Sequence, residues 1–290
     1  MKRYLQLTAL ASILAFMFSG LLLAQDKEPV YPPFETVTLI DNQTTFQPYK
    51  GSFNLEIQHR FSQIKDIKDI YGIYGSANTR IGADYAITDK IMVGLGTTRS
   101  FMQQDLQWKY LIISQKESGG SPLTLSYFGN AVLDARADKY FGPEDEYNFM
   151  YRFSYTTQLI ASRKFGEKVG IQMAPSFVYF NAVPEGYRND NYSLDVGARF
   201  QILGLSSIIL EYDQPLVQPQ DKVNTAGDLI EGKTIYPNLA FGVEIGTSTH
   251  SFRVFVSNYN AIVKNRSVAF NDRNPWDGDF QFGFNISIRF

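Results

Sequence analysis

Residues 280–290 alternate between apolar and polar side chains without a break. Because successive side chains of a β-strand point to opposite faces, such a segment separates two different environments. The stretch that starts at Phe53 repeats the pattern, with Glu56, Gln58 and Arg60 between apolar neighbours. The apolar face of the last segment consists of Phe280, Phe282, Phe284, Ile286, Ile288 and Phe290.

Ten further segments of this kind lie between these two, and short and long connections alternate along the chain. The third-to-fourth connection, near Arg99–Gln104, is the exception, because it is short where a long one is expected. An even number of strands with short turns at one end and long loops at the other is the layout of outer-membrane barrels. We therefore predict an all-β fold over residues 52–290, a transmembrane antiparallel up-and-down β-barrel of about 12 strands with short periplasmic turns and long extracellular loops. The expected long connections are 62–75, 134–148, 181–190, 213–233 and 259–278.

A soluble β-sandwich also alternates, so it is the main alternative. It fits less well, because nearly every outward face carries an aromatic residue and the start of the chain indicates export. A sheet in lipid must close on itself, since lipid cannot satisfy backbone hydrogen-bonding groups. Pro175, inside the seventh segment, predicts a bulge.

The beginning of the chain indicates export. Lys2 and Arg3 precede an apolar run to Leu23, which predicts a signal peptide over residues 1–24. An uncleaved anchor is the alternative, because the run is long enough to span a bilayer. The expected location is the bacterial outer membrane with both termini periplasmic. Residues 25–51 then form a periplasmic tail or a plug that enters the barrel.

The amino-acid composition argues against several kinds of functional site. The chain has no cysteine and two histidines, so thiolate chemistry is excluded and a multi-histidine metal site is not expected. We predict no metal and no cofactor. Without Lys2 and Arg3, acidic residues outnumber basic ones. The chain therefore lacks the excess of basic residues that is typical of nucleic-acid-binding proteins.

The strand pattern turns a set of charged side chains toward the lumen. They can line a polar passage for small hydrophilic solutes, or they can pair across the interior and fill it. Barrels of about eight strands are filled by side chains and those of about sixteen leave a channel, so about twelve leaves both alternatives open. The lumen-lining candidates are Glu56, Arg60, Arg80, Asp84, Arg152, Asp195, Arg199, Glu244, Arg253 and Arg289.

Three other features carry weaker hypotheses. His59 faces lipid near Ser76, a pair that a membrane phospholipase would use, but the sequence offers no residue to orient the histidine. We therefore expect no enzyme. The acidic loop 134–148 fits either a calcium site or a solvated loop. The loop around Trp276 fits a carbohydrate or partner contact, or a plain polar loop.

Two resemblances extend these predictions. The terminal strand, which ends at Phe290, resembles the assembly signal of outer-membrane barrels, which implies outer-membrane lipid and the barrel-assembly machinery as partners. Residues 39–45, 57–61, 78–85 and 87–90 resemble an uncharacterised outer-membrane β-barrel family of Bacteroidota, a domain of unknown function. The likeness runs from about Thr36 to the end. It implies fold and location and brings no activity.

The leading functional hypothesis is a passive channel for small hydrophilic solutes. The second is a structural or interaction barrel that scaffolds an envelope complex through its loops and terminal segments. A membrane phospholipase is third.

Overall fold

The computed structural model describes residues 29–65, 68, 72–117, 120–224 and 227–290. The predicted signal peptide, residues 1–24, lies outside these ranges. Among the residues described, no helix is long and apolar enough to cross a membrane.

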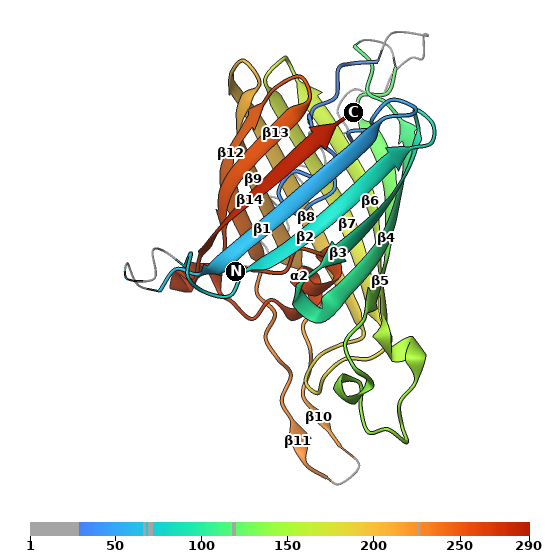
Figure 1. Ribbon diagram of the computed structural model, residues 1–290, viewed down its shortest axis with the longest axis vertical. Helices are drawn as coiled ribbons and strands as arrows, with labels where there is room; N and C mark the ends of the chain where they lie inside the picture. The colour runs from blue at the N-terminus through green and yellow to red at the C-terminus, as the bar shows by residue number, and fades with distance from the viewer. Residues whose placement is uncertain (1–28, 66–67, 69–71, 118–119, 225–226) are drawn as a thin grey trace.

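Twelve antiparallel strands form a closed barrel (Figure 1). Each strand pairs with the next barrel strand along the chain, and the first pairs with the last, so the predicted up-and-down barrel is confirmed. The strands are β1 (Phe53–Gln63), β2 (Asn78–Ala86), β3 (Ile91–Thr98), β4 (Gln103–Ile113), β5 (Thr124–Asp134), β6 (Phe153–Phe165), β7 (Val169–Phe180), β8 (Asp190–Leu203), β9 (Ser206–Pro215), β12 (Asn238–Gly246), β13 (His250–Ser257) and β14 (Gln281–Arg289).

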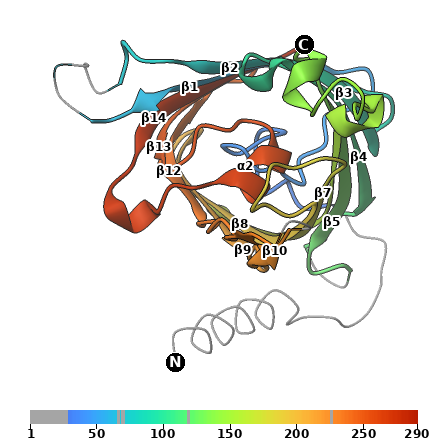
Figure 2. The ribbon, with the colours of Figure 1, turned by 90° about the horizontal axis from the view of Figure 1, so that it is seen from below.

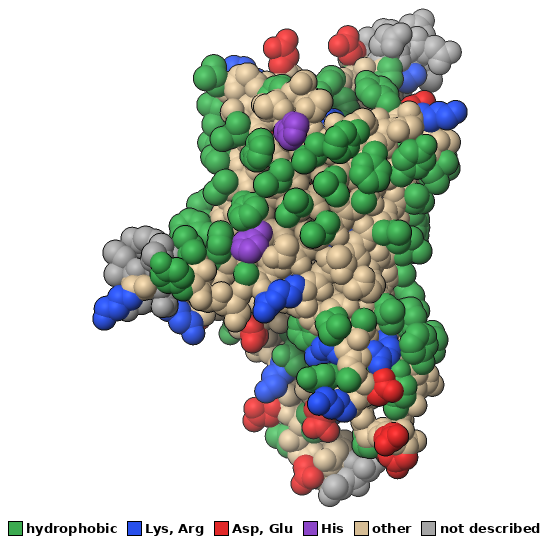
Figure 3. Space-filling model, viewed as in Figure 1, with side chains coloured by type: hydrophobic (Ala, Val, Ile, Leu, Met, Phe, Trp, Pro, Cys, Tyr) green, Lys and Arg blue, Asp and Glu red, His purple; other side chains and the backbone are tan. Residues whose placement is uncertain are grey.

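The two faces of the barrel differ as the alternation predicts. Along β1, Asn54, Glu56, Gln58 and Arg60 are buried inside, and the residues between them face outward. On the face seen in Figure 3, apolar side chains are spread over the barrel wall, and most of the charged side chains lie over the loops at the lower end. An apolar band between polar ends is the surface that a barrel presents to a bilayer.

The two ends of the barrel differ in the length of their connections. The short-turn end holds the connections after β2, β4, β6, β8 and β12 together with the C-terminus, and Gly166 and Gly204 adopt positive φ there. The long-loop end holds the remaining loops (Figure 1). Its short elements are η2 (Ser100–Met102), η3 (Asp138–Tyr140), η4 (Phe149–Arg152), β10 (Lys222–Val223), β11 (Leu229–Ile230), α2 (Lys264–Phe270) and η5 (Pro275–Asp277).

The prediction of a bulge at Pro175 is wrong. The register between β6 and β7 is the same on both sides of this residue, and β7 pairs with β8 through Pro175 without a shift. The pairs opposite Pro175 and Ala174 on β6 are missing instead. Proline lacks an N–H, so it removes a hydrogen bond from one ladder without inserting a residue.

The barrel closes between β1 and β14. Phe290 N–H donates to the Phe53 carbonyl at 2.9 Å, and the Phe53 N–H donates back at 3.1 Å. The Phe290 side chain is 74% exposed, and its ring centroid lies 6.3 Å from that of Phe53. The last residue therefore completes the backbone seam and contributes little to the core.

Deleting Phe290 is expected to lower the amount of assembled barrel much more than its final stability. The folded state loses one backbone pair and a ring contact worth about 0.5–1.5 kcal/mol. Outer-membrane abundance and heat-modifiability on gels would measure the two effects separately, with Phe290→Tyr as the control. Unchanged abundance would show that the terminal aromatic is not an assembly signal in this chain.

Two segments occupy the interior of the barrel (Figure 2). Residues 34–46, here called the plug, run inside it ahead of β1, and α2 folds inward from the long-loop end. Both carry side chains that are almost completely buried.

Candidate functional site

The plug packs an apolar cluster against the inner wall. Phe34, Val37, Leu39 and Ile40 are each at most 1% exposed. Their burial removes apolar surface from water, which stabilises the segment inside the barrel. The apolar residues of the wall and the β13–β14 connection in this cluster are Met92, Ile209, Ala240, Phe255 and Tyr259.

A wall carboxylate holds the turn of the plug. Glu211 of β9 accepts backbone N–H bonds from Ile40 at 2.7 Å, Asp41 at 3.0 Å and Asn42 at 3.0 Å. Successive N–H groups that converge in this way form a concave anion site, here filled by a side chain of the same molecule. These three residues belong to the stretch 39–45, one of the stretches that carried the family resemblance.

Two basic residues of the wall, on β1 and β4, bind the plug as well. Arg60 forms an ion pair with Asp41 at 2.5 Å, and the two side chains are 0% and 1% exposed. Lys109 Nζ donates to the carbonyls of Thr44 at 3.1 Å and Phe46 at 2.6 Å. The inward charges therefore meet the main chain and side chains of the plug.

Arg253 and Glu56 form a further anchor. Their side chains are 2.7 Å apart, and Arg253 also donates to the carbonyls of Thr38 and Leu39. The Thr38 hydroxyl donates to Glu56 at 2.9 Å. Arg253 and Glu56 were among the lumen-lining candidates, and the structure brings both onto the plug.

Other inward candidates pair with the wall itself. Arg80 forms an ion pair with Asp105 at 2.7 Å, and Asp84 accepts a hydrogen bond from Gln107 at 2.5 Å. These contacts reach from β2 to β4 across Gly94 and Gly96 of β3, so they stiffen that side of the barrel.

Two more of the lumen-lining candidates lie beside the plug, near the short-turn end of the barrel. Arg199 lies 3.3 Å from Glu244 and 3.7 Å from Glu35. The Arg289 guanidinium lies 5.0 Å from the ring centroid of Phe46.

Arg152 requires a correction. It lies in η4, which Asn148 caps, and its side chain contacts Tyr147 at 2.6 Å and pairs with Asp138. The sequence pattern continues into 149–152, but the chain turns there before β6 begins. Arg152 therefore belongs to the long-loop end and not to the membrane-spanning part of the lumen.

Lys264 connects α2 to both the wall and the plug. Its Nζ lies 2.7 Å from Asp213 of β9 and 3.1 Å from Asp195 of β8, another of the inward candidates. It also donates to Asn42 of the plug at 2.5 Å. A void beside these residues, between plug, wall and α2, measures about 30 Å³, which is room for about two water molecules.

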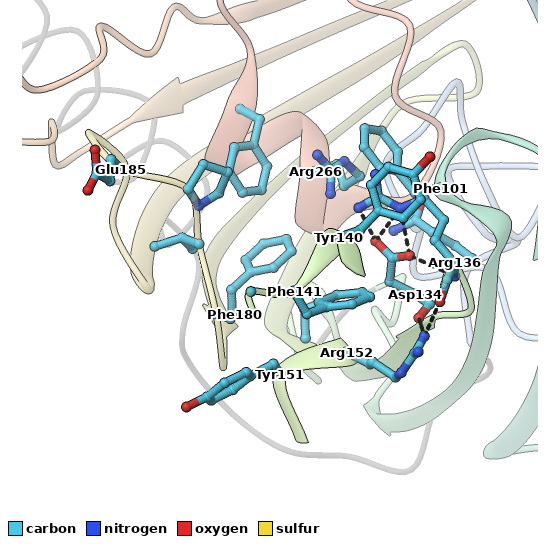
Figure 4. A pocket seen from close by; sticks show the side chains of 17 residues that line it. Phe101, Asp134, Arg136, Tyr140, Phe141, Tyr151, Arg152, Phe180, Glu185 and Arg266 are labelled. Carbon is cyan, nitrogen blue, oxygen red and sulfur yellow. Dashed lines mark hydrogen bonds and ion pairs between the residues drawn. The ribbon is translucent and has the colours of Figure 1, made fainter. Parts of the chain in front are cut away.

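A larger cavity of about 480 Å³, here called the cup, lies at the long-loop end (Figure 4). It is formed by the β3–β4, β5–β6 and β7–β8 connections together with α2. Aromatic rings and three guanidinium groups face it. The residues used below are Phe101, Asp134, Arg136, Arg152, Arg266 and Phe270.

The three guanidinium groups of the cup have different partners. Arg136 pairs with Asp134 at 2.7 Å, and Arg152 pairs with Asp138. Arg266 lies 3.4 Å from the ring centroid of Phe101, and no carboxylate among the residues that the structure describes forms an ion pair with it. The sequence analysis missed the cup, because its residues come from loops with no periodicity.

His59 does not form the constellation of a phospholipase. Its Nδ1 lies 2.9 Å from the Thr79 hydroxyl, and its ring stacks on Phe284 with 5.0 Å between centroids. The described contacts of His59 include neither Ser76 nor a carboxylate. That the chain is not an enzyme stays a prediction. Among the described residues, no group of acidic and histidine side chains could hold a metal ion, in the acidic loop 134–148 or elsewhere.

A closed sheet of twelve strands with an apolar outer face and a polar interior defines an outer-membrane β-barrel. The chain belongs to the family described as "Membrane bound beta barrel domain (DUF5777)", whose model matches residues 34–290. The match begins at the first residue of the plug, so the plug is part of the family's domain. This confirms the predicted likeness to a barrel family of unknown function, and the bacterial phylum stays a prediction.

Several solved structures match this chain at low identity, and the first of them reaches the similarity of a shared fold. The NanC porin is 6% identical with a TM-score of 0.50, and the match covers 81% of this chain and 98% of that chain. An outer membrane channel from Pseudomonas putida F1 is 8% identical with a TM-score of 0.49, covering 84% and 97%. Outer membrane phospholipase A from Escherichia coli is 12% identical with a TM-score of 0.38, covering 88% and 98%. No curated protein matches the sequence.

Proposed function

We propose that this protein is an outer-membrane interaction barrel, closed along its axis by its own plug, which binds a ligand or partner at the long-loop end. The occupied lumen is the observation that carries this proposal. The void of about 30 Å³ between plug, wall and α2 is too small for a solute. The cup, at about 480 Å³, falls within the range of small-molecule sites of about 300–1,000 Å³.

The attachment of the plug argues against its leaving the lumen by thermal motion. Withdrawal would separate Asp41 from Arg60 and strip Glu211 of three N–H donors. Removing one partner of a buried ion pair costs about 3–5 kcal/mol. It would also expose the apolar cluster around Phe34 and Ile40. Withdrawal of the plug incurs all of these costs at once. The state with the plug inside the lumen therefore dominates unless a ligand or partner stabilises an open state.

The passive-channel hypothesis is therefore the weaker of the two leading hypotheses. A polar wall supports it, because Glu56, Arg60, Arg80 and Arg253 would line a passage if the plug were absent. With the plug in place, the same residues hold protein atoms instead of solute. The likeness to a porin supports the fold only.

The full chain, reconstituted in planar bilayers as a heat-modifiable barrel, is expected to give no steady current. Liposomes that contain it are expected to swell in small sugars no faster than liposomes without protein. A steady conductance with the unmodified chain would overturn the proposal and restore the passive channel. Fluorescence of the inserted protein is the control for successful reconstitution.

A further inference from the structure

We infer that the cup binds a small soluble organic anion, with a carboxylate or phosphate group on Arg266 and an apolar or aromatic body against the surrounding rings. The inference deepens the proposed function and rests on it, because it names the chemical class of ligand for the long-loop end.

Within the part of the chain that the structure describes, no carboxylate forms an ion pair with Arg266. Its guanidinium is stacked against Phe101 at 3.4 Å and against Phe270 at 4.5 Å, whereas Arg136 and Arg152 each pair with an aspartate. Burial lowers the pKa of Arg266 to about 10, Asp134 opposes this shift, and the charge of Arg136 adds to it. Arg266 thus stays charged at neutral pH, and a bound anion would stabilise that charge.

The N–H donors of Arg266 determine which polar group of a ligand can bind to it. Two rings contact the guanidinium, and the described residues accept no hydrogen bond from its N–H donors. Those donors match the two oxygens of a carboxylate or phosphate. The cup and a neighbouring cavity of about 140 Å³ share Phe101 and Arg266, so Arg266 is reached from both.

The aromatic side chains define the rest of the ligand. Tyr140, Phe141, Tyr151 and Phe180 line the cup beside Phe101 (Figure 4). Such a lining with a few polar groups is typical of sites for small organic molecules. Glu185 lies across the cavity from the arginines in Figure 4, so the anionic end of a ligand belongs at the Arg266 side.

The backbone at Phe101 is held in an uncommon conformation. Phe101 has φ 60° and Met102 has φ 46°, a left-handed region that bulky residues rarely occupy. The strained turn places the Phe101 ring on two guanidinium groups, those of Arg136 and Arg266. Strain that persists because its surroundings fix it is characteristic of binding sites.

The test uses calorimetry on the purified full chain in a non-ionic detergent. Phenyl phosphate and benzoate are the anionic probes, and benzyl alcohol is the neutral one of similar shape. Arg266→Met is expected to weaken binding of the anions by about 10- to 100-fold, the loss expected for a charge-assisted contact. Arg188→Met is the matched control, because Arg188 pairs with Asp190 at the β7–β8 connection outside the cup. It is expected to bind like the wild type.

Stability separates a binding role from a structural one. Since Arg266 has no carboxylate partner among the described residues, Arg266→Met is expected to unfold at the same temperature as the wild type or higher. Lower stability together with unchanged anion binding would overturn the inference. Benzyl alcohol binding as tightly as phenyl phosphate would overturn it too, as would binding only to vesicles of anionic lipid. A barrel that conducts no current and binds neither anion would contradict the proposed ligand of the cup. The proposal that the plug closes the barrel would still stand.

Discussion

Deleting residues 34–46 is expected to convert a silent barrel into a conducting one. The wall residues that hold the plug, among them Arg60, Lys109, Glu211 and Arg253, would then face water across the lumen. Rings of such side chains set the ion preference of a passage. Single-channel recording in planar bilayers would detect the change. Because α2 still covers the long-loop end, Lys264→Ala in the deletion background is expected to raise the current further.

The control for this deletion removes the β10–β11 ribbon, residues 222–230, which lies outside the lumen. That variant is expected to stay silent. If the plug deletion assembles poorly, replacing Leu39, Ile40 and Asp41 by serine keeps the chain length and still weakens the plug. A heat-modifiable plug deletion without current would mean that the wall and α2 close the barrel by themselves.

Asp41→Ala is expected to destabilise the barrel by about 3–5 kcal/mol, because it leaves the Arg60 charge buried without a carboxylate. Both side chains are at most 1% exposed, so water does not compensate. Urea unfolding in lipid vesicles, followed by fluorescence, would measure the free energy of unfolding.

A double variant distinguishes the charge from the packing. Asp41→Ala with Arg60→Met removes the unpaired charge and is expected to recover most of the lost stability. Asp221→Ala, in the long loop that leads into the β10–β11 ribbon, is the control and is expected to change stability little. An Asp41→Ala barrel as stable as the wild type would show that the pair does not hold the plug.

The barrel could be predicted from the sequence because each strand carries its own period. The alternation from Phe53 indicated that Glu56 and Arg60 point inward, and the structure has them inside. The alternation of a strand shows which side chains point inward, but it does not show which groups they contact there. Water, another wall residue and a plug all satisfy a buried arginine equally well, so the use of Arg253 could not be predicted.

The residues that form the plug and the cup follow no regular alternation of apolar and polar residues in the sequence. Of the four aromatic residues in 25–51, Phe34 and Phe46 are buried, but Tyr49 is 81% exposed and Tyr31 is 56% exposed. The plug's partners lie far away in sequence, as with Ile40 and Glu211. Arg266 lies in a long loop whose fold depends on those distant contacts. Such sites form only after the barrel has closed.

A single short helix, α2, carries residues that reach two compartments of the molecule. Arg266 lines the cup, and Lys264, one half-turn earlier, donates to Asn42 of the plug at 2.5 Å. Any movement of α2 that accompanies occupancy of the cup alters the environment of the plug, and thermodynamic linkage makes the influence reciprocal. Such coupling would carry a change at the long-loop end to the plug without the passage of a solute. Residues 29–33 precede the plug near the short turns, so a change in the plug would reach that end of the barrel through them.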